Sequence, residues 1–191
     1  MKLENPLQIK PFKARRGRLA RTLGEGVVVL PTAQEHHRNA DTHYDYRWDS
    51  GFYYLTGFRE PEAVLVMVLG AKPRTILFCR EKNLEREIWD GYRYGPEMGR
   101  EMFGFDEAYP YGELDQRLPD LIANQDLLHT PVGADLAWDA RVAGWLGHGQ
   151  GLVDGTAGRG LSFEADAAGQ VALRVHVDDQ DALVGEGQSR R

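Results

Sequence analysis

The residues best suited to chemistry lie between His36 and Ser50. Three histidines and three aspartates fall in this stretch: His36, His37, His43, Asp41, Asp45 and Asp49. Imidazole and carboxylate groups are the usual ligands of divalent metals. The spacing argues against a metal site, because neighbouring histidine side chains diverge and no histidine pair flanks a glutamate at helical spacing. We therefore expect a polar loop whose side chains hydrogen-bond to its own backbone.

Two aromatic segments follow this loop. We expect the rings of the first, mainly Phe52, Tyr54 and Phe58, to pack in the core at a sheet edge, with a ligand-binding cage as the alternative. The second segment, 81–95, places Trp89 among charged residues. An exposed tryptophan in such surroundings is a common contact residue. A tryptophan lying back on the sheet is the structural alternative, and the sequence favours neither.

Motifs for nucleophilic catalysis and phosphate binding are missing. The sequence contains no Gly-x-Ser-x-Gly, no P-loop and no glycine fingerprint after a strand.

Its single cysteine, Cys79, cannot form an internal disulfide or a cysteine zinc cage, which suits a reducing compartment. The N-terminus shows no secretory signal, and the longest apolar stretch, 63–69, is far too short to span a membrane. We expect a cytoplasmic protein without a membrane partner.

The charge balance disfavours nucleic acid as a partner. The 191 residues carry a net charge of -6, so the molecule as a whole does not attract phosphate backbones. One segment is locally basic, with Lys10, Lys13, Arg15, Arg16, Arg18 and Arg21. Because no aromatic residues alternate with them to stack on bases, we expect these side chains to form the solvated face of a first helix.

Hydrophobic spacing predicts an α/β fold. The pattern of 11–23 is typical of an amphipathic helix, and 26–31 of a buried strand. Segments 63–69 and 74–80 are predicted as neighbouring central strands joined by a turn. The first of these is apolar almost throughout, which indicates burial on both faces of a sheet covered by helices.

The later part of the chain continues this pattern. We expect a helix over 112–125, kinked or divided at Pro119, then a strand over 126–132 and a closing helix over 136–147. Residues 151–191 hold seven glycines but one aromatic residue. We expect a solvated, disordered tail there, with 171–177 as its one candidate strand.

Three ordered motifs give the chain a family resemblance. They are Arg38-Asn-Ala-Asp41-x-x-Tyr44-x-Tyr46-Arg47, then Asp49-Ser50-x-Phe52-Tyr53-Tyr54-Leu55-Thr56-Gly57-Phe58-x-Glu60-Pro61-Glu62-Ala63, then Glu87-Ile88-Trp89-x-Gly91. Together they resemble the N-terminal domain of the Xaa-Pro aminopeptidase (aminopeptidase P) family, in the creatinase and prolidase group. The resemblance spans about residues 9–150. It implies a mixed β-sheet flanked by helices, with a ribonuclease H-like topology, preceding a pita-bread catalytic domain.

The resemblance also implies a function. In the family, the catalytic domain uses two manganese ions to release an N-terminal residue before proline, and the N-terminal domain shapes active-site access and subunit contacts. Trp89 matches a contact residue near a neighbouring subunit's active-site mouth. A structural or substrate-mouth role is implied for the polar segment, at Asp41, Tyr44, Tyr46, Arg47 and Asp49. No catalytic or metal-binding residue carries over.

The chain departs from the family after its first domain. We expect an aminopeptidase P N-terminal domain at 1–150 and a divergent Gly- and Asp-rich tail at 151–191, with the pita-bread domain and its metal ligands absent, as in a truncated or frame-shifted product. No cofactor is then expected in this chain. Expected partners are further copies, full-length aminopeptidase subunits and proline-containing peptides. The alternative is a free-standing interaction module that binds such subunits or peptides through the Phe52–Phe58 and Trp89 surfaces.

Overall fold

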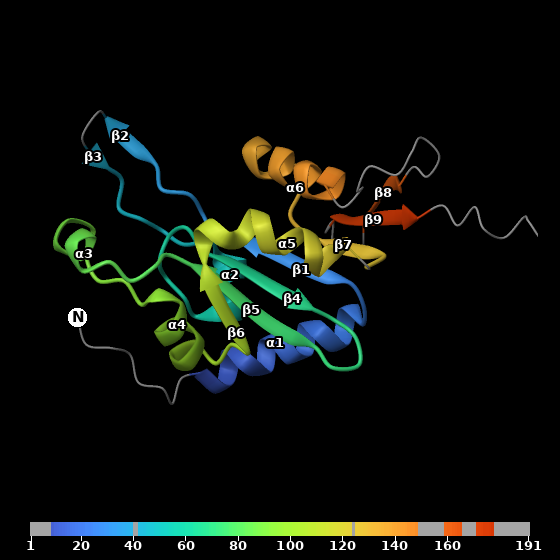
Figure 1. The fold of residues 1–191 in the computed structure, drawn as a ribbon, viewed down its shortest axis with the longest axis horizontal. Helices are drawn as coiled ribbons and strands as arrows, with labels where there is room; N and C mark the ends of the chain where they lie inside the picture. Colours follow the sequence, from blue (N-terminus) through green and yellow to red (C-terminus); the bar gives the residue numbers. More distant parts are fainter. Residues whose placement is uncertain (1–8, 40–41, 124, 149–158, 166–170, 178–191) are drawn as a thin grey trace, which may run out of the picture.

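A seven-stranded mixed sheet with helices on both faces organises the protein (Figure 1). The computed structural model describes residues 9–39, 42–123, 125–148, 159–165 and 171–177. The order of strands in the sheet is β6-β5-β4-β1-β7-β9-β8. Among the described residues, no helix has the length and apolar character needed to cross a membrane.

The elements alternate along the chain. The sheet is built from β1 (Val27–Pro31), β4 (Val64–Val68), β5 (Arg74–Cys79), β6 (Glu107–Pro110), β7 (Leu127–His129), β8 (Arg159–Ala165) and β9 (Val171–Val177). A separate two-stranded ribbon consists of β2 (His37–Asn39) and β3 (Thr42–His43). The helices are α1 (Ile9–Leu23), α2 (Ser50–Thr56), α3 (Leu84–Asp90), α4 (Gly95–Phe103), α5 (Leu114–Ile122) and α6 (Leu136–His148), with a 3-10 turn, η2 (Tyr111–Glu113), before α5.

The predicted central pair of strands is confirmed. β4 is antiparallel to β5, with Val66 opposite Ile76, and antiparallel to β1, with Val66 opposite Val29. β6 is parallel to β5, and β7 is parallel to β1. The sheet is therefore mixed, as expected. The candidate strand at 171–177 forms β9, antiparallel to β7, whereas β8 was not predicted. The rest of 151–191 lies outside the described residues.

The continuous apolar character of β4 reflects burial on both faces. Side chains alternate along a strand, so Val64 and Val66 enter one core, while Leu65 and Met67 enter the other. All four are at most 1% exposed. Two hydrophobic cores thus share the sheet, one on each face.

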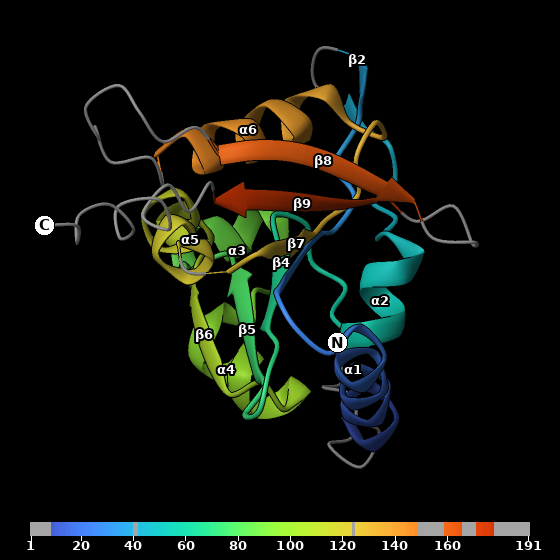
Figure 2. The same ribbon diagram turned by 90° about the vertical axis from the view of Figure 1, so that its right-hand side faces the viewer.

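Different helices cover the two cores, one set on each face of the sheet (Figure 2). α5 and α6 cover the first core with Leu118, Trp138 and Val142. α1, α2 and α4 lie on the other face, where Phe52 and Phe58 are buried. Pro119 neither divides nor ends α5, which continues to Ile122. The expected helix over 136–147 is confirmed as α6.

Arg16 corrects the prediction of a fully solvated basic face on the first helix. Its side chain is 1% exposed. The guanidinium donates to the carbonyl oxygens of Leu55 at 2.9 Å, Phe103 at 3.0 Å and Gly104 at 2.7 Å. These carbonyls lie at the C-terminal ends of α2 and α4, where they have no partner within the helix. A cation is also favoured at the negative end of a helix dipole. Arg16 therefore joins three helices.

The Arg16 guanidinium stays protonated although it is buried. Desolvation lowers the pKa of Arg16 to about 10, against which the carboxylate of Asp106 acts, so the group remains protonated at neutral pH. The guanidinium carbon also lies 4.4 Å from the ring centroid of Phe105. Hydrogen-bonded carbonyls and an aromatic face replace most of the water that this group loses, although its buried Nε has no hydrogen-bond partner.

A second polar network joins α5 to α6. Arg141 donates to both carboxylate oxygens of Asp115, at 2.7 and 3.0 Å, and Trp145 Nε1 donates to the same group at 2.7 Å. The hydrogen bonds from Arg141 hold the pKa of Asp115 below its ordinary value; partial burial opposes them, and Trp145 adds to them.

Replacing Arg16 with methionine should lower the free energy of unfolding by about 3 kcal/mol, because three buried carbonyls lose charged donors. Urea denaturation followed by circular dichroism measures this. Arg18→Met, at an exposed position of the same helix, serves as the control and should change stability by less than about 0.5 kcal/mol. Equal stability of the two variants would contradict the role assigned to Arg16.

Replacing Asp115 with asparagine should lower the melting temperature at pH 7 by roughly 3 °C. A carboxyl group whose pKa is lowered by folding stabilises the protein above about pH 4 and loses that effect as pH falls through the folded pKa. The difference from the wild type should therefore shrink below pH 4 in thermal melts at a series of pH values. Asp120→Asn, on an exposed site of the same helix, should show neither effect. A pH-independent difference would argue against this linkage.

Candidate functional site

Both candidate segments leave the sheet at the same end. β1 and β5 run in the same direction, because each is antiparallel to β4. The polar segment, His36–Ser50, follows β1, and the Trp89 segment, 81–95, follows β5. The β2–β3 ribbon and α3 therefore project from one end of the molecule (Figure 1).

The polar segment does not gather its predicted residues at one point. Its β2–β3 ribbon is closed by a hydrogen bond from Tyr44 N to His36 O at 2.9 Å. The Tyr44 side chain is 59% exposed, and Arg47 is also exposed. Asp41 lies outside the described residues. The described residues of the whole chain form no group of three histidine, cysteine or acidic side chains that could hold a metal.

Tyr46 attaches the polar segment to the end of β1. Its hydroxyl is 2.8 Å from Thr32 Oγ1 and donates to Ala33 O at 3.1 Å. Burial raises the pKa of Tyr46, although the hydrogen bond with Thr32 acts in the opposite direction. The side chain is thus held as a neutral structural contact.

Asp49 initiates α2. Its Oδ1 accepts a hydrogen bond from Phe52 N at 2.7 Å, and its extended backbone is typical of an N-cap residue. Gly57 ends the helix in the left-handed conformation. The expectation that this segment fixes its own backbone is confirmed at Asp49, although the helix that follows was not predicted.

The aromatic segment is mostly core. Phe52 and Phe58 are fully buried, as expected, but Tyr54 is 49% exposed, which corrects the prediction for that ring. The chain's own guanidinium groups cover its outward rings: Arg15 lies 4.2 Å from the centroid of Tyr54. These rings therefore form packing contacts and no open cage. Phe52 and Phe58 are therefore inaccessible to a partner of the alternative interaction module, whereas Tyr54 stays exposed on that surface.

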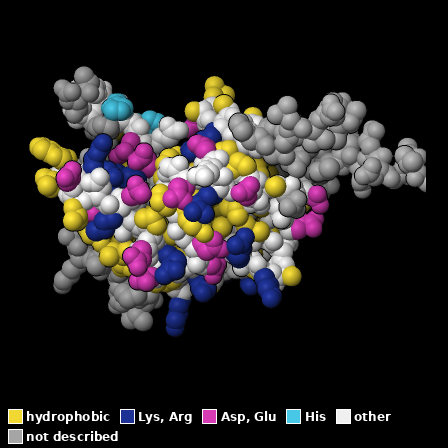
Figure 3. Space-filling model, viewed as in Figure 1, with side chains coloured by type: hydrophobic (Ala, Val, Ile, Leu, Met, Phe, Trp, Pro, Cys, Tyr) yellow, Lys and Arg dark blue, Asp and Glu magenta, His cyan; other side chains and the backbone are white. Residues whose placement is uncertain are grey.

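Trp89 lies on the outside of α3, which answers the question that its sequence surroundings leave open. Its side chain is 86% exposed, and those of Leu84 and Ile88 are 71% and 78% exposed. We call these three residues the α3 apolar stripe. Hydrophobic side chains protrude at the end of the molecule that carries α3 (Figure 3). The signals for this helix are the Asn83 cap and the four-residue spacing from Leu84 to Ile88.

One charged residue of α3, Glu87, faces its own domain, whereas Glu85 and Arg86 are exposed. The Glu87 side chain is 15% exposed and its Oε1 lies 3.0 Å from Lys82 Nζ. Asn83 Oδ1 accepts a hydrogen bond from Arg86 N at 3.0 Å and caps the helix. An ordinary surface helix buries its apolar residues, whereas α3 leaves Leu84, Ile88 and Trp89 exposed.

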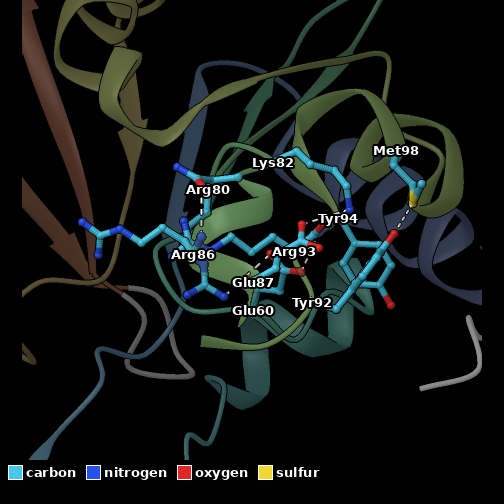
Figure 4. Close-up of polar contacts among 10 residues, drawn as sticks. Glu60, Arg80, Lys82, Arg86, Glu87, Tyr92, Arg93, Tyr94 and Met98 are labelled. Atoms are coloured by element: carbon cyan, nitrogen blue, oxygen red, sulfur yellow. Dashed lines mark hydrogen bonds and ion pairs between the residues drawn. The ribbon is translucent and has the colours of Figure 1, made fainter. Parts of the chain in front are cut away.

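A group of charged residues gathers around Glu60 and Glu87 of α3 (Figure 4). We call it the basal cluster: Glu60, Arg80, Lys82, Glu87 and Arg93. Glu60 is 7% exposed, and its Oε1 accepts a hydrogen bond from Tyr94 N at 2.8 Å. Burial raises the pKa of Glu60, while the Tyr94 N–H and the charges of Arg80 and Arg93 oppose that rise. Sequence analysis missed this cluster, because Glu60 lies 20 or more residues before the other four members.

Known proteins share this architecture. Residues 12–129 match the family model described as aminopeptidase P, N-terminal domain. The Xaa-Pro aminopeptidase of Escherichia coli K12 is 38% identical over 125 residues, covering 64% of this chain and 28% of its own length. Xaa-Pro aminopeptidase 3 of Dictyostelium discoideum is 42% identical over 106 residues, covering 54% and 20%.

Solved structures agree with the sequence matches. Zinc-substituted E. coli aminopeptidase P in complex with product superposes with a TM-score of 0.71 at 34% identity, over 73% of this chain and 32% of that one. Pseudomonas aeruginosa aminopeptidase gives a TM-score of 0.70 at 38% identity, over the same shares. The chain spans less than a third of the length of these relatives. With its sheet, its motifs and most of its length matched, the chain belongs to the aminopeptidase P N-terminal domain family.

Proposed function

We propose that this chain is the non-catalytic N-terminal domain of an Xaa-Pro aminopeptidase, which shapes access to the active site and contacts a neighbouring subunit through the α3 apolar stripe. The exposure of Trp89, Leu84 and Ile88 carries the proposal. Partners of this kind are further copies of the chain or full-length aminopeptidase subunits, and the location is the cytoplasm.

The physical argument rests on the cost of leaving these side chains in water. Adjacent exposed apolar groups rimmed by charges are typical of protein contact sites. Tryptophan is also strongly enriched among the residues that dominate binding energy. Because the ion pair with Lys82 holds Glu87 toward the domain, a partner would cover the apolar residues on the outer side of α3.

The metal chemistry of the family is assigned to residues outside this domain. The family resemblance implies two manganese ions, but the donor groups in the described part of the chain do not fit them. Cys79 offers no soft ligand, because it is buried and desolvation raises the pKa of its thiol to about 12. In this proposal, peptides with proline in the second position meet the domain only at the entrance to the active site.

A free-standing interaction module stays as the second candidate, with the Trp89 surface and the exposed Tyr54 ring of the Phe52–Phe58 segment as its binding surfaces. The same exposed stripe supports it. It differs in that the chain does not associate with itself but binds intact aminopeptidase subunits or proline-containing peptides. Binding of the purified chain to an intact Xaa-Pro aminopeptidase, without self-association, would favour this candidate.

Trp89→Ala should weaken self-association of the chain by about 30-fold or more, because truncating an interface tryptophan typically removes about 2 kcal/mol or more of binding energy. Sedimentation velocity over a concentration series measures the association constant. The matched control is Leu136→Ala, which truncates another exposed apolar side chain, 83% exposed, on α6. Both variants should keep the wild-type unfolding free energy within about 0.5 kcal/mol. Equal association of the two variants would contradict the proposal.

The purified chain should not hydrolyse an Xaa-Pro-Xaa tripeptide with added manganese, because the described residues assemble no metal site. Release of the N-terminal amino acid, followed by chromatography at high protein concentration with and without a chelator, measures this. Chelator-sensitive turnover would overturn the non-catalytic assignment and make the His36–Asp49 segment the first candidate for the metal site.

A further inference from the structure

We propose that Glu60 is the positioning residue of the α3 apolar stripe. Its carboxylate contacts both ends of the segment 80–94 that carries α3, and these contacts, which we call the clasp, fix the position of Trp89. The importance of that presentation rests on the proposed function. The clasp itself is a property of this chain and can be tested separately.

The first step is that α3 has little apolar support. In the described part of the chain, no strand or other helix packs closely along α3. Its apolar side chains point to solvent, so the hydrophobic cores contribute little to its placement. Most secondary elements are fixed by burying an apolar face, and α3 must be fixed in another way.

The second step is that the segment is a closed loop. It leaves the sheet after Cys79 and returns at Gly95, where α4 begins. A Cβ on Gly95 would lie 3.1 Å from Lys82 Cβ and 3.2 Å from Lys82 N, so the two ends of the loop touch. Lys82 Nζ also donates to Arg93 O at 3.1 Å. The position of α3 therefore depends on the contacts at this base.

The third step is that Glu60 lies at this base and faces both ends (Figure 4). Oε1 accepts the hydrogen bond from Tyr94 N on the returning end. Oε2 lies 4.0 Å from the Arg80 guanidinium on the departing end, which makes a long ion pair without a hydrogen bond. When only side-chain atoms are counted, 9% of the Glu60 surface and 10% of the Arg80 surface are exposed. A pair of charges is screened less by salt in such a position than at the surface.

Tyr94 connects the clasp to the rigid core. Its ring centroid lies 5.7 Å from that of Phe58 and 5.1 Å from that of Phe103. The ring is thus fixed by packing, while its backbone N–H is fixed by Glu60. Removing the carboxylate should leave the ring and the sheet in place and release the loop between Lys82 and Arg93.

Amide hydrogen exchange followed by mass spectrometry tests the clasp in the full chain. It is best measured in the Trp89→Ala background, because exchange is then free of any contact made through Trp89. Glu60→Gln should speed exchange of the amides in 82–94 about ten-fold and leave β4 and β5 unchanged. Arg80→Gln should produce the same local effect. Glu101→Gln, at an exposed position on α4, is the matched control and should change neither region.

Unchanged exchange of 82–94 in both Glu60→Gln and Arg80→Gln would overturn the proposal. Equal acceleration in β4 and β5 would also overturn it, because the effect would then be global. If the clasp is confirmed but Trp89→Ala leaves self-association intact, the proposed function fails and the positioning role of Glu60 stands.

Discussion

The buried guanidinium of Arg16 is the interaction on which one half of the structure depends. It reaches from α1 to the carbonyl ends of α2 and α4. Those three helices cover one face of the sheet, and each brings a different stretch of chain to it. Helix ends cannot satisfy their own last carbonyls, so one planar group with several donors fixes two helix ends at once. On the other face, a hydrophobic core packs under α5 and α6, and Asp115, Arg141 and Trp145 join these two helices at the surface.

This framework explains why the candidate site lies at one end of the sheet. β1 and β5 end on the same side, and the connections that follow them are the polar segment and the α3 segment. The first is fastened by Tyr46 and Asp49, which act on backbone and on neighbouring hydroxyl groups. The second is fastened by charges around Glu60. Polar contacts at the rim of a packed sheet can hold a segment while leaving its apolar side free for a partner.

Membership of the aminopeptidase P N-terminal domain family agrees with this division of roles. The residues of the matched region build a sheet, two helical layers and an exposed stripe, and the described donor groups form no metal site. In the function proposed above, the domain acts through shape and contact. Its contribution to an enzyme would be measured in association and substrate access, whereas bond cleavage would depend on groups supplied elsewhere.

The sequence by itself determined the central strands, the flanking helices α1 and α6, and the family, because hydrophobic periodicity and ordered motifs are local properties of the chain. It also indicated that Asp49 belongs to a self-fixing segment. Only the tertiary structure decided that Arg16 is buried, that Tyr54 is partly exposed, and that Trp89 faces solvent. Each of these depends on groups far apart in the sequence: the Arg16 partners lie 39 to 88 residues away. Burial of a charge depends on which distant carbonyls surround it, and no local pattern records that.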